Sequence, residues 1–121
     1  MDTELTRAEL RLAELLWPRA PLPSPELVAL CEREMGWKKS TTYTMLKRLE
    51  NKGIFQNDGG TVRACLTREE FDAAHSRQFV RDSFGGSLPR FLAAFAGGRQ
   101  LSRAEAEELQ RLIDEHREDK P

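Results

Sequence analysis

A β-hairpin pattern directly follows three short helical patterns in the first 66 residues. Two apolar runs, residues 54–56 and 62–66, flank an Asn-Asp-Gly-Gly turn at residues 57–60, and apolar runs around a glycine-rich turn are typical of a hairpin. Three short helices followed by a hairpin is the element order of a winged helix-turn-helix. The sequence therefore predicts a mainly α fold with a small β-hairpin that forms the wing.

The first two helical patterns begin and end at recognisable residues. Thr6 and Glu9 form a capping-box pattern, and the proline after Trp17 ends the first helix, because the residue before proline disfavours the helical conformation. We expect no regular structure in the proline-rich stretch 18–23. Ser24, which a proline follows, is expected to be the N-cap of the second helix.

The third helical pattern covers residues 41–52, with Gly53 at its C′ position. At about 100° per residue, one face is predicted to be buried, and it carries Thr42, Met45, Leu46 and Leu49. The opposite face is basic and rich in hydroxyl groups, and it is made of Ser40, Tyr43, Thr44, Lys47, Arg48 and Asn51.

Positive charge is concentrated in the same region. The whole chain has a formal net charge of −1, but residues 36–63 contain six basic and two acidic side chains. A local surplus of positive charge in an otherwise acidic chain indicates a surface for a polyanion. The candidate DNA contacts lie at the start of the third helix, on its outer face and on the wing: Lys38, Lys39, Ser40, Thr41, Tyr43, Thr44, Lys47, Arg48, Thr61 and Arg63.

These candidates are assigned two kinds of contact. The outer face of the third helix would reach base edges in the major groove, as a recognition helix does, while the helix start and the wing would meet phosphates. Each assignment has a structural alternative. The basic face can simply be solvated, Tyr43 can pack on the preceding helix, and Thr61 and Arg63 can be ordinary outward residues of a strand.

Residues 67–117 are predicted to form further helices. A second capping-box pattern at Thr67 and Glu70 starts a helix that reaches Gly85, and shorter helices follow from Ser87 and Ser102. Their apolar stripes are too long for a monomer to cover, which indicates a helical dimerisation arm. The predicted dimer contacts are Phe84, Leu88, Phe91, Leu92, Phe95, Leu109, Leu112 and Ile113.

This pattern divides the chain into two parts. Residues 5–66 are predicted to form a winged-helix DNA-binding domain, and residues 67–117 are predicted to form a helical dimerisation region. Both cysteines, both tryptophans and His75 are expected to have no functional role. Cys31 and Cys65 are interpreted as small buried hydrophobic residues, Trp17 and Trp37 are assigned to the core, and His75 is assigned to the surface.

Several other classes of protein are not expected. The sequence contains no nucleophile elbow, phosphate-binding loop or pair of carboxylates in a glycine-bounded turn, so no enzyme is expected. Two cysteines and two histidines show no ligand spacing, so no metal or other cofactor is expected. No apolar run approaches the roughly 18 residues of a membrane span, and the first residues lack the pattern of a signal peptide, so we expect a cytoplasmic location.

Three segments carry a resemblance to a known family. Residues 5–10 with Leu16-Trp17 resemble the opening helix, residues 37–53 resemble the recognition helix, and residues 84–88 with 101–109 resemble the C-terminal dimerisation region of the BlaI/MecI family of penicillinase repressors. The resemblance covers residues 5–116. It implies a homodimeric transcriptional repressor that binds a palindromic DNA operator, typically with TACA/TGTA half-sites.

The resemblance also bears on how such a repressor is switched off. In some members a membrane sensor triggers proteolytic cleavage, so a sensor-linked protease is a further partner that the resemblance implies. The Asn-Phe bond cleaved in the penicillinase repressors aligns with Ala94-Phe95 in this chain, so the asparagine is absent. Copper-sensing members carry paired C-terminal cysteines, whereas residues 117–121 contain none, which argues against copper sensing.

Two other functions stay open at this point. A winged-helix protein-interaction module without DNA binding would carry an exposed apolar patch on the third helix rather than a basic surplus. A small ligand-gated regulator would need a pocket lined by convergent polar groups, which the sequence does not indicate.

Overall fold

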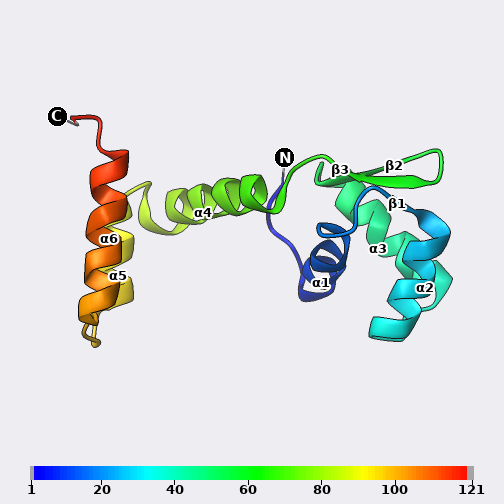
Figure 1. Cartoon of the computed structure of the whole chain (residues 1–121), viewed down its shortest axis with the longest axis horizontal. Helices are drawn as coiled ribbons and strands as arrows, with labels where there is room; N and C mark the ends of the chain where they lie inside the picture. The colour runs from blue at the N-terminus through cyan, green and yellow to red at the C-terminus, as the bar shows by residue number, and fades with distance from the viewer. Residues whose placement is uncertain (1, 120–121) are drawn as a thin grey trace. The chain divides into compact units, whose positions relative to one another are not determined.

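The structure is a computed structural model that describes residues 2–119 (Figure 1). Within these residues it contains six helices and one three-stranded sheet, which confirms the predicted mainly α fold with a small β-hairpin. The chain divides into two compact units, and the boundary between Phe79 and Val80 falls inside α4. The elements in chain order are α1 (Arg7–Leu16), β1 (Leu22–Pro23), α2 (Ser24–Met35), α3 (Lys39–Asn51), β2 (Phe55–Asp58), β3 (Thr61–Ala64), α4 (Arg68–Phe84), α5 (Leu88–Ala96) and α6 (Arg103–His116).

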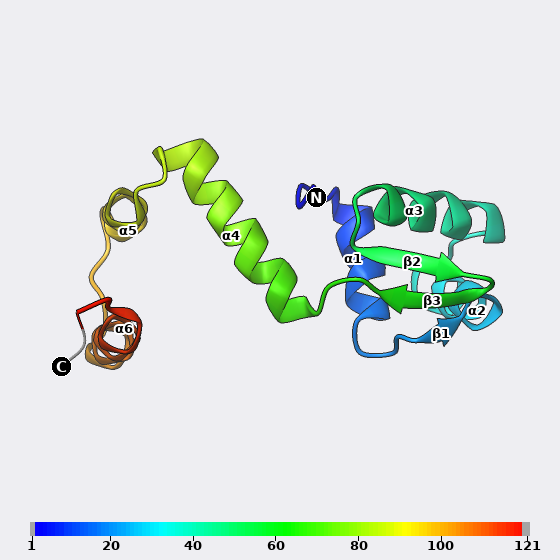
Figure 2. The ribbon, with the colours of Figure 1, turned by 90° about the horizontal axis from the view of Figure 1, so that it is seen from above.

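The core of the first unit is built by α1, α2, α3 and the sheet, which Figure 2 shows side by side. Burial of one large apolar side chain stabilises a fold by about 1.5–3 kcal/mol. Each of these elements contributes to the core, so the wing is packed onto the helices rather than projecting from them. Side chains at most 1% exposed include Leu12, Leu16, Leu27, Leu46, Leu49, Ile54, Phe55 and Val62.

The hairpin forms as predicted. β2 and β3 pair antiparallel, with Phe55 opposite Ala64 and Asp58 opposite Thr61. The two residues between the strands, Gly59 and Gly60, have φ of 59° and 99°. Positive φ at both central residues is the geometry of the tight turns that match strand twist, and glycine adopts it without strain.

The proline-rich stretch corrects one expectation. The sequence predicts no regular structure for residues 18–23, but Leu22 pairs with Val62 and Pro23 pairs with Thr61, so that the short strand β1 lies beside β3. Proline cannot donate a ladder hydrogen bond and is therefore tolerated on an edge strand of this kind. The pairing places the start of α2 next to the wing.

The helix starts are partly as predicted. Thr6 and Glu9 form the reciprocal capping box, because the Glu9 N–H donates to Thr6 Oγ1 at 3.2 Å and the Thr6 N–H donates to Glu9 Oε1 at 3.4 Å. The expected N-cap at Ser24 is wrong. Ser24 is the first helical residue of α2, Pro23 is the cap, and the Ser24 hydroxyl instead accepts a hydrogen bond from Tyr43.

Glu9 is a buried carboxylate that joins α1 to the end of α3. Its side chain is 2% exposed, and its Oε2 lies 2.7 Å from Nζ of Lys52. Burial raises the pKa of the Glu9 carboxyl, but hydrogen bonds from Lys52 and Thr6 together outweigh burial and hold the pKa below its ordinary value. The group is therefore held ionised in the fold.

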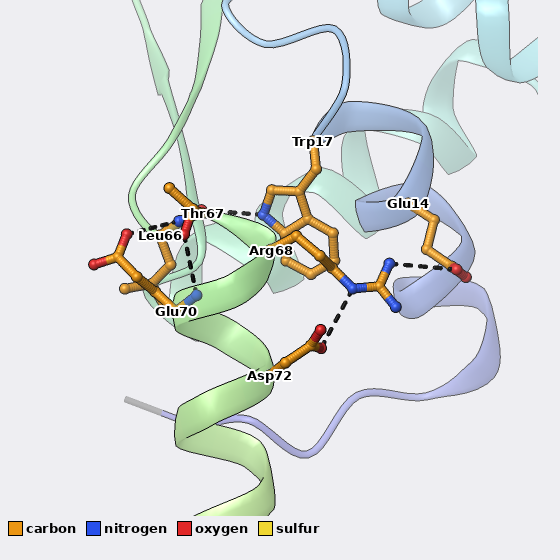
Figure 3. A network of polar contacts seen from close by, with 7 residues as sticks. All are labelled: Glu14, Trp17, Leu66, Thr67, Arg68, Glu70 and Asp72. Carbon is orange, nitrogen blue, oxygen red and sulfur yellow. Dashed lines mark hydrogen bonds and ion pairs between the residues drawn. The ribbon is translucent and has the colours of Figure 1, made fainter. Parts of the chain in front are cut away.

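Trp17 anchors the start of α4 on the first unit (Figure 3). Its indole Nε1 donates to the carbonyl oxygen of Leu66 at 3.0 Å, and the Arg68 guanidinium lies over the indole, 5.1 Å from the ring centroid. Arg68 also pairs with Glu14 at 3.4 Å and with Asp72 at 3.3 Å. The segment that leads from Leu66 into α4 is thus fixed to the end of α1 by one hydrogen bond, one cation–π contact and one ion pair.

The second predicted capping box forms at the start of α4. The Glu70 N–H donates to Thr67 Oγ1, and the Thr67 N–H donates to Glu70 Oε1, both at 3.0 Å (Figure 3). One turn later, Phe71 is 4% exposed and its ring lies 5.2 Å from that of Trp17. The first half of α4 therefore belongs to the packed core of the first unit.

The two tryptophans and the two cysteines differ in burial. Trp17 and Trp37 are partly buried against the core, as predicted, and Cys31 is buried. Cys65 is exposed, so its assignment to the interior is wrong. Val62 is the buried residue of β3, and a period of two places Cys65 on the outward face with Arg63.

His75 is half-buried, so its assignment to the surface is also wrong. Its ring stacks on Phe71 with centroids 5.6 Å apart, and its Nδ1 lies 3.3 Å from Oγ1 of Thr3. Thr3 is 2% exposed and also bonds to Gln78. The N-terminal segment thus packs on α4, which no pattern within α4 itself indicates.

The second unit consists of the end of α4 with α5 and α6. Ser87 caps α5 by accepting from the Arg90 N–H at 3.2 Å, and Ser102 caps α6 by accepting from the Glu105 N–H at 3.1 Å. The rings of Phe84 and Phe91 meet edge to face at 5.4 Å.

Among residues 2–119, no helix combines the length and apolar character needed to cross a membrane.

Candidate nucleic-acid interface

The two faces of α3 differ sharply in burial. Its inner face is buried as predicted, with Thr42, Met45, Leu46 and Leu49 exposed by 0, 8, 1 and 0%. The Thr42 hydroxyl is satisfied within the helix, because it donates to the carbonyl oxygen of Lys38 at 3.3 Å. This packing fixes the rotation of α3 about its axis and turns the opposite face outward.

Most candidate contacts on α3 reach the outer surface. Exposed side chains at the start and on the outer face are Lys38, Lys39, Ser40, Thr41, Thr44, Lys47 and Arg48. Tyr43 is half-buried, and its hydroxyl donates to Ser24 Oγ at 3.2 Å. Its phenol ring therefore contacts α2 as well as the outer groove.

The start of α3 favours anions. The helix begins at Lys39, and among the described residues no side chain makes a capping hydrogen bond there and no acidic residue stands in the first turn. The first amide donors of a helix point away from the helix body, and the helix dipole adds positive potential at that end. Lys38 and Lys39 reinforce this potential, which suits phosphate oxygens.

The wing carries the remaining two candidates. Arg63 is exposed, and its Nε lies 3.7 Å from the Asp58 carboxylate on the paired strand. Thr61 is half-buried beside the Gly59-Gly60 turn. Arg63 lines a cleft of about 810 Å³ together with Trp17 and Arg68, so it does not face the same hollow as the outer surface of α3.

An open groove of about 560 Å³ runs between α3 and β2. Tyr43, Thr44, Lys47 and Arg48 line one side of this groove. Leu46, Glu50 and Asn57 complete it, and none of the three is among the candidate DNA contacts. The groove therefore brings together hydroxyl, amide, basic and acidic groups, which are the groups that can hydrogen-bond to base edges.

Glu50 and Asn57 connect helix and wing directly. Glu50 Oε1 accepts the backbone N–H of Asn57 at 2.7 Å, and its Oε2 lies 4.0 Å from Nζ of Lys47. In the sequence, Glu50 stands out only as one of two acidic residues in the basic segment. Its contact with Asn57 depends on the packing of β2 against α3, which no local pattern encodes.

The site has no features of a metal centre. Within the part of the chain that the structure describes, no group of three or more His, Cys, Asp or Glu side chains could hold a metal ion. The chemistry available at the α3 surface is hydrogen bonding and charge, as in nucleic-acid recognition.

Comparison with known proteins places the chain in a family. A family model described as penicillinase repressor matches residues 5–115. The penicillinase repressor of Bacillus licheniformis is 26% identical over 118 residues, which cover 94% of this chain and 92% of that protein. The methicillin resistance regulatory protein MecI of Staphylococcus aureus (strain N315) is 22% identical over 115 residues, covering 92% of this chain and 94% of that protein.

These matches confirm the resemblance carried by the three sequence segments. The identities are low, but the matched region runs through both units rather than through the winged helix alone. The chain therefore belongs to the penicillinase repressor family, which is a family of transcriptional repressors.

Proposed function

We propose that this repressor binds a palindromic DNA operator as a homodimer, with α3 as its recognition helix. The observation that carries the proposal is the two-sided character of α3. Its apolar side is buried, while its exposed side is made of hydroxyl and basic groups. A helix of this kind fits the major groove, where each base pair presents a distinct pattern of donors and acceptors.

Different parts of the surface are assigned different roles in binding. Lys38, Lys39 and Ser40 at the start of α3 would contact phosphates, because helix dipole and side-chain charge add there. Thr44 and Lys47, which line the open groove, would reach base edges. Arg63 on the wing would meet the neighbouring sugar-phosphate backbone.

The helices after the hairpin supply the proposed dimer contact. Exposed large apolar side chains gather on α5 and α6, where Leu88 is 56%, Phe95 55% and Ile113 50% exposed. Apolar stripes of this kind mark protein–protein contact surfaces. We assign DNA binding to residues 5–66 and dimerisation to residues 67–117, with the packed first half of α4 joining the two functions.

The alternative, a protein-interaction module without DNA binding, receives less support. Such a module would present apolar side chains on α3. Among the described residues, the exposed large hydrophobic side chains lie in or beside α4, α5 and α6, and none lies in α3. A protein partner is therefore expected at the C-terminal helices, and DNA is expected at α3.

Selection of bound sequences from a random DNA pool tests the proposal. We expect a two-fold symmetric site with half-sites about 34 Å apart. If the dimer makes about six phosphate contacts, affinity should fall roughly a thousandfold between 50 and 200 mM salt. Equal binding to scrambled DNA with a flat salt response would favour the interaction module.

Two substitutions separate phosphate contact from base readout. Lys39→Ala should weaken operator and random DNA alike and reduce the salt slope by about one for each phosphate that the lysine neutralises. Thr44→Ala should cost about 1–3 kcal/mol on the selected operator and little on random DNA. Glu32→Ala, an exposed change on α2, is the control. If Thr44→Ala affects all sequences equally, or none, the reading face of α3 is assigned wrongly.

A further inference from the structure

Four hydrogen bonds, joined into a ring by the backbone of α3, tie the wing turn to both helices of the helix-turn-helix. Starting from α3, Glu50 Oε1 accepts the Asn57 N–H at 2.7 Å. Asn57 Oδ1 accepts the Gly60 N–H at 3.0 Å, and the Gly60 carbonyl oxygen accepts the Ser24 N–H at 2.7 Å. The Tyr43 hydroxyl then donates to Ser24 Oγ at 3.2 Å, which returns the ring to α3.

Each member of this ring joins a different part of the first unit. Tyr43 lies in the N-terminal half of α3 and Glu50 near its C-terminal end, Asn57 lies on β2, Gly60 forms the hairpin turn and Ser24 begins α2. The turn is therefore held between the two helices by polar contacts, in addition to the apolar packing of Phe55 and Val62 beneath the sheet.

Glu50 is the one carboxylate in the ring. Its side chain is 22% exposed, so water competes only weakly for its oxygens. A charged acceptor strengthens a hydrogen bond from a backbone N–H. The second oxygen faces Lys47 at 4.0 Å across a much more exposed contact, so the bond to Asn57 is the stronger of the two.

The position of Glu50 is unexpected for a surface that binds DNA. A carboxylate in the groove with Thr44, Lys47 and Arg48 repels phosphates and lowers affinity for every sequence. A group with that cost requires a compensating role. The bond to Asn57 supplies one, because it fixes where the wing stands relative to the reading face of α3.

We propose that Glu50 is a positioning residue for operator recognition, which sets the wing against α3 through the Asn57 amide. The proposal rests on the proposed DNA-binding function and adds to it a residue that lowers general affinity while raising selectivity. A wing held in one place contacts the backbone only when α3 is in register with the operator. A loose wing contacts the backbone of any sequence.

The alternative role for Glu50 is direct base readout, in which the carboxylate accepts a hydrogen bond from a cytosine amino group. In the structure Oε1 accepts the Asn57 N–H. Readout would therefore use Oε2, which lies 4.0 Å from Nζ of Lys47. The two roles make different predictions for a glutamine at this position, because an amide oxygen still accepts from Asn57 but the carboxylate charge is gone.

Two variants of the full-length protein test the proposal. Glu50→Gln keeps an acceptor for the Asn57 N–H, whereas Glu50→Met keeps the side-chain length and helix propensity but has no strong acceptor. The first measurement is amide hydrogen exchange at Asn57 and Gly60 in the absence of DNA. We expect Asn57 protection to fall about tenfold or more in Glu50→Met and to change by less than about threefold in Glu50→Gln.

The second measurement is affinity for the selected operator and for scrambled DNA. Glu50→Gln should bind both at least as tightly as the unmodified protein and keep its operator preference. Glu50→Met should gain affinity for scrambled DNA while its operator preference falls about tenfold. Glu32→Met, on the exposed side of α2, controls for a general effect of removing a carboxylate.

Each of the two measurements can overturn the proposal independently of the other. Unchanged Asn57 protection in Glu50→Met overturns the positioning role whether or not the protein binds DNA. Loss of operator preference in Glu50→Gln to the level of Glu50→Met also overturns it, and favours direct readout. If exchange behaves as expected but the unmodified protein selects no DNA sequence, the proposed function fails while the positioning of the wing by Glu50 stands.

Discussion

The two compact units of the chain bury their apolar side chains to very different extents. In the first unit, Leu12, Leu16 and Leu49 are fully buried. In the second unit, α5 and α6 contain no buried residue. The first unit thus holds its fold with its own core, while the second presents apolar surface to solvent. This difference supports the proposal that the first unit folds around its own core, while a second copy of the chain covers the apolar side chains of α5 and α6.

The largest expected effect comes from a core truncation in the first unit. Phe55 is 1% exposed, so Phe55→Ala should lower the free energy of unfolding by about 3–5 kcal/mol. Phe95→Ala removes the same side chain from α5, where it is 55% exposed, and should change the stability of the first unit by less than about 0.5 kcal/mol. Urea unfolding followed by amide exchange in α1 checks both values. Equal losses would abolish the distinction between the units.

Ion pairs provide a second contrast. The Glu9–Lys52 pair is largely buried, whereas the Arg103–Glu107 pair on α6 is exposed by 93% and 68%. Glu9→Gln should cost about 3 kcal/mol, because it removes the only carboxylate paired with Lys52 among the described residues and leaves the ammonium with the Glu4 carbonyl oxygen. Glu107→Gln should cost less than about 0.5 kcal/mol. Chemical denaturation at neutral pH measures both.

The same pair predicts how stability depends on pH. Hydrogen bonds hold the pKa of Glu9 below its ordinary value of 4.5 in the fold. Its contribution is therefore fully present above the unfolded-state pKa and is lost as pH falls through the lower folded-state pKa. The unmodified protein should lose stability more steeply than Glu9→Gln as pH falls below about 4.5. Parallel acid titrations of both proteins would contradict this account.

The exposed apolar surface of the second unit should respond to charge. Ile113→Glu places a carboxylate among apolar residues of α6, and we expect it to raise the dimer dissociation constant about 30-fold or more, as loss of an interface hot spot does. Ala104→Glu adds the same charge elsewhere on α6 and should leave association unchanged. Sedimentation equilibrium distinguishes the two. An unmodified chain that is monomeric at micromolar concentration would refute the proposed dimer.

The smallest effect concerns the joint between α1 and α4. Arg68→Ala removes the guanidinium from the face of Trp17 together with the ion pair to Glu14, and should cost about 1 kcal/mol. Arg103→Ala, on exposed α6, should cost no more than about 0.5 kcal/mol. Thermal unfolding of both variants checks the difference. A larger loss for Arg103→Ala would show that the second unit is held by more than its exposed contacts.

Much of the fold could be predicted from local sequence patterns. The capping boxes at Thr6 and Thr67 and the buried face of α3 all follow from spacing within single helices, and the structure confirms them. These features depend on hydrogen bonds or periodicity over a few residues. The Gly59-Gly60 turn was predictable for the same reason, because positive φ at both residues favours glycine.

The features that sequence reasoning missed depend on contacts between distant segments. The pairing of Leu22 with Val62 joins residues forty positions apart, and the bond from Tyr43 to Ser24 joins two helices. The role of Glu50 depends on where β2 packs against α3. Local charge and periodicity predict which face of α3 points outward. They do not show which side chains on that face already form hydrogen bonds with other parts of the protein.

Trp17 gives the protein a built-in optical reporter. Its indole meets the rings of Phe55 from the sheet and Phe71 from α4, and the Arg68 charge lies over its face. Indole emission is sensitive to nearby charge and to water, so separation of α4 from the sheet would shift the Trp17 spectrum. Trp37, between α2 and α3, would report separately on the helix-turn-helix. With no attached dye, variants that keep only one of the two tryptophans can therefore tell a change at the α4 joint from a change at the DNA-binding surface.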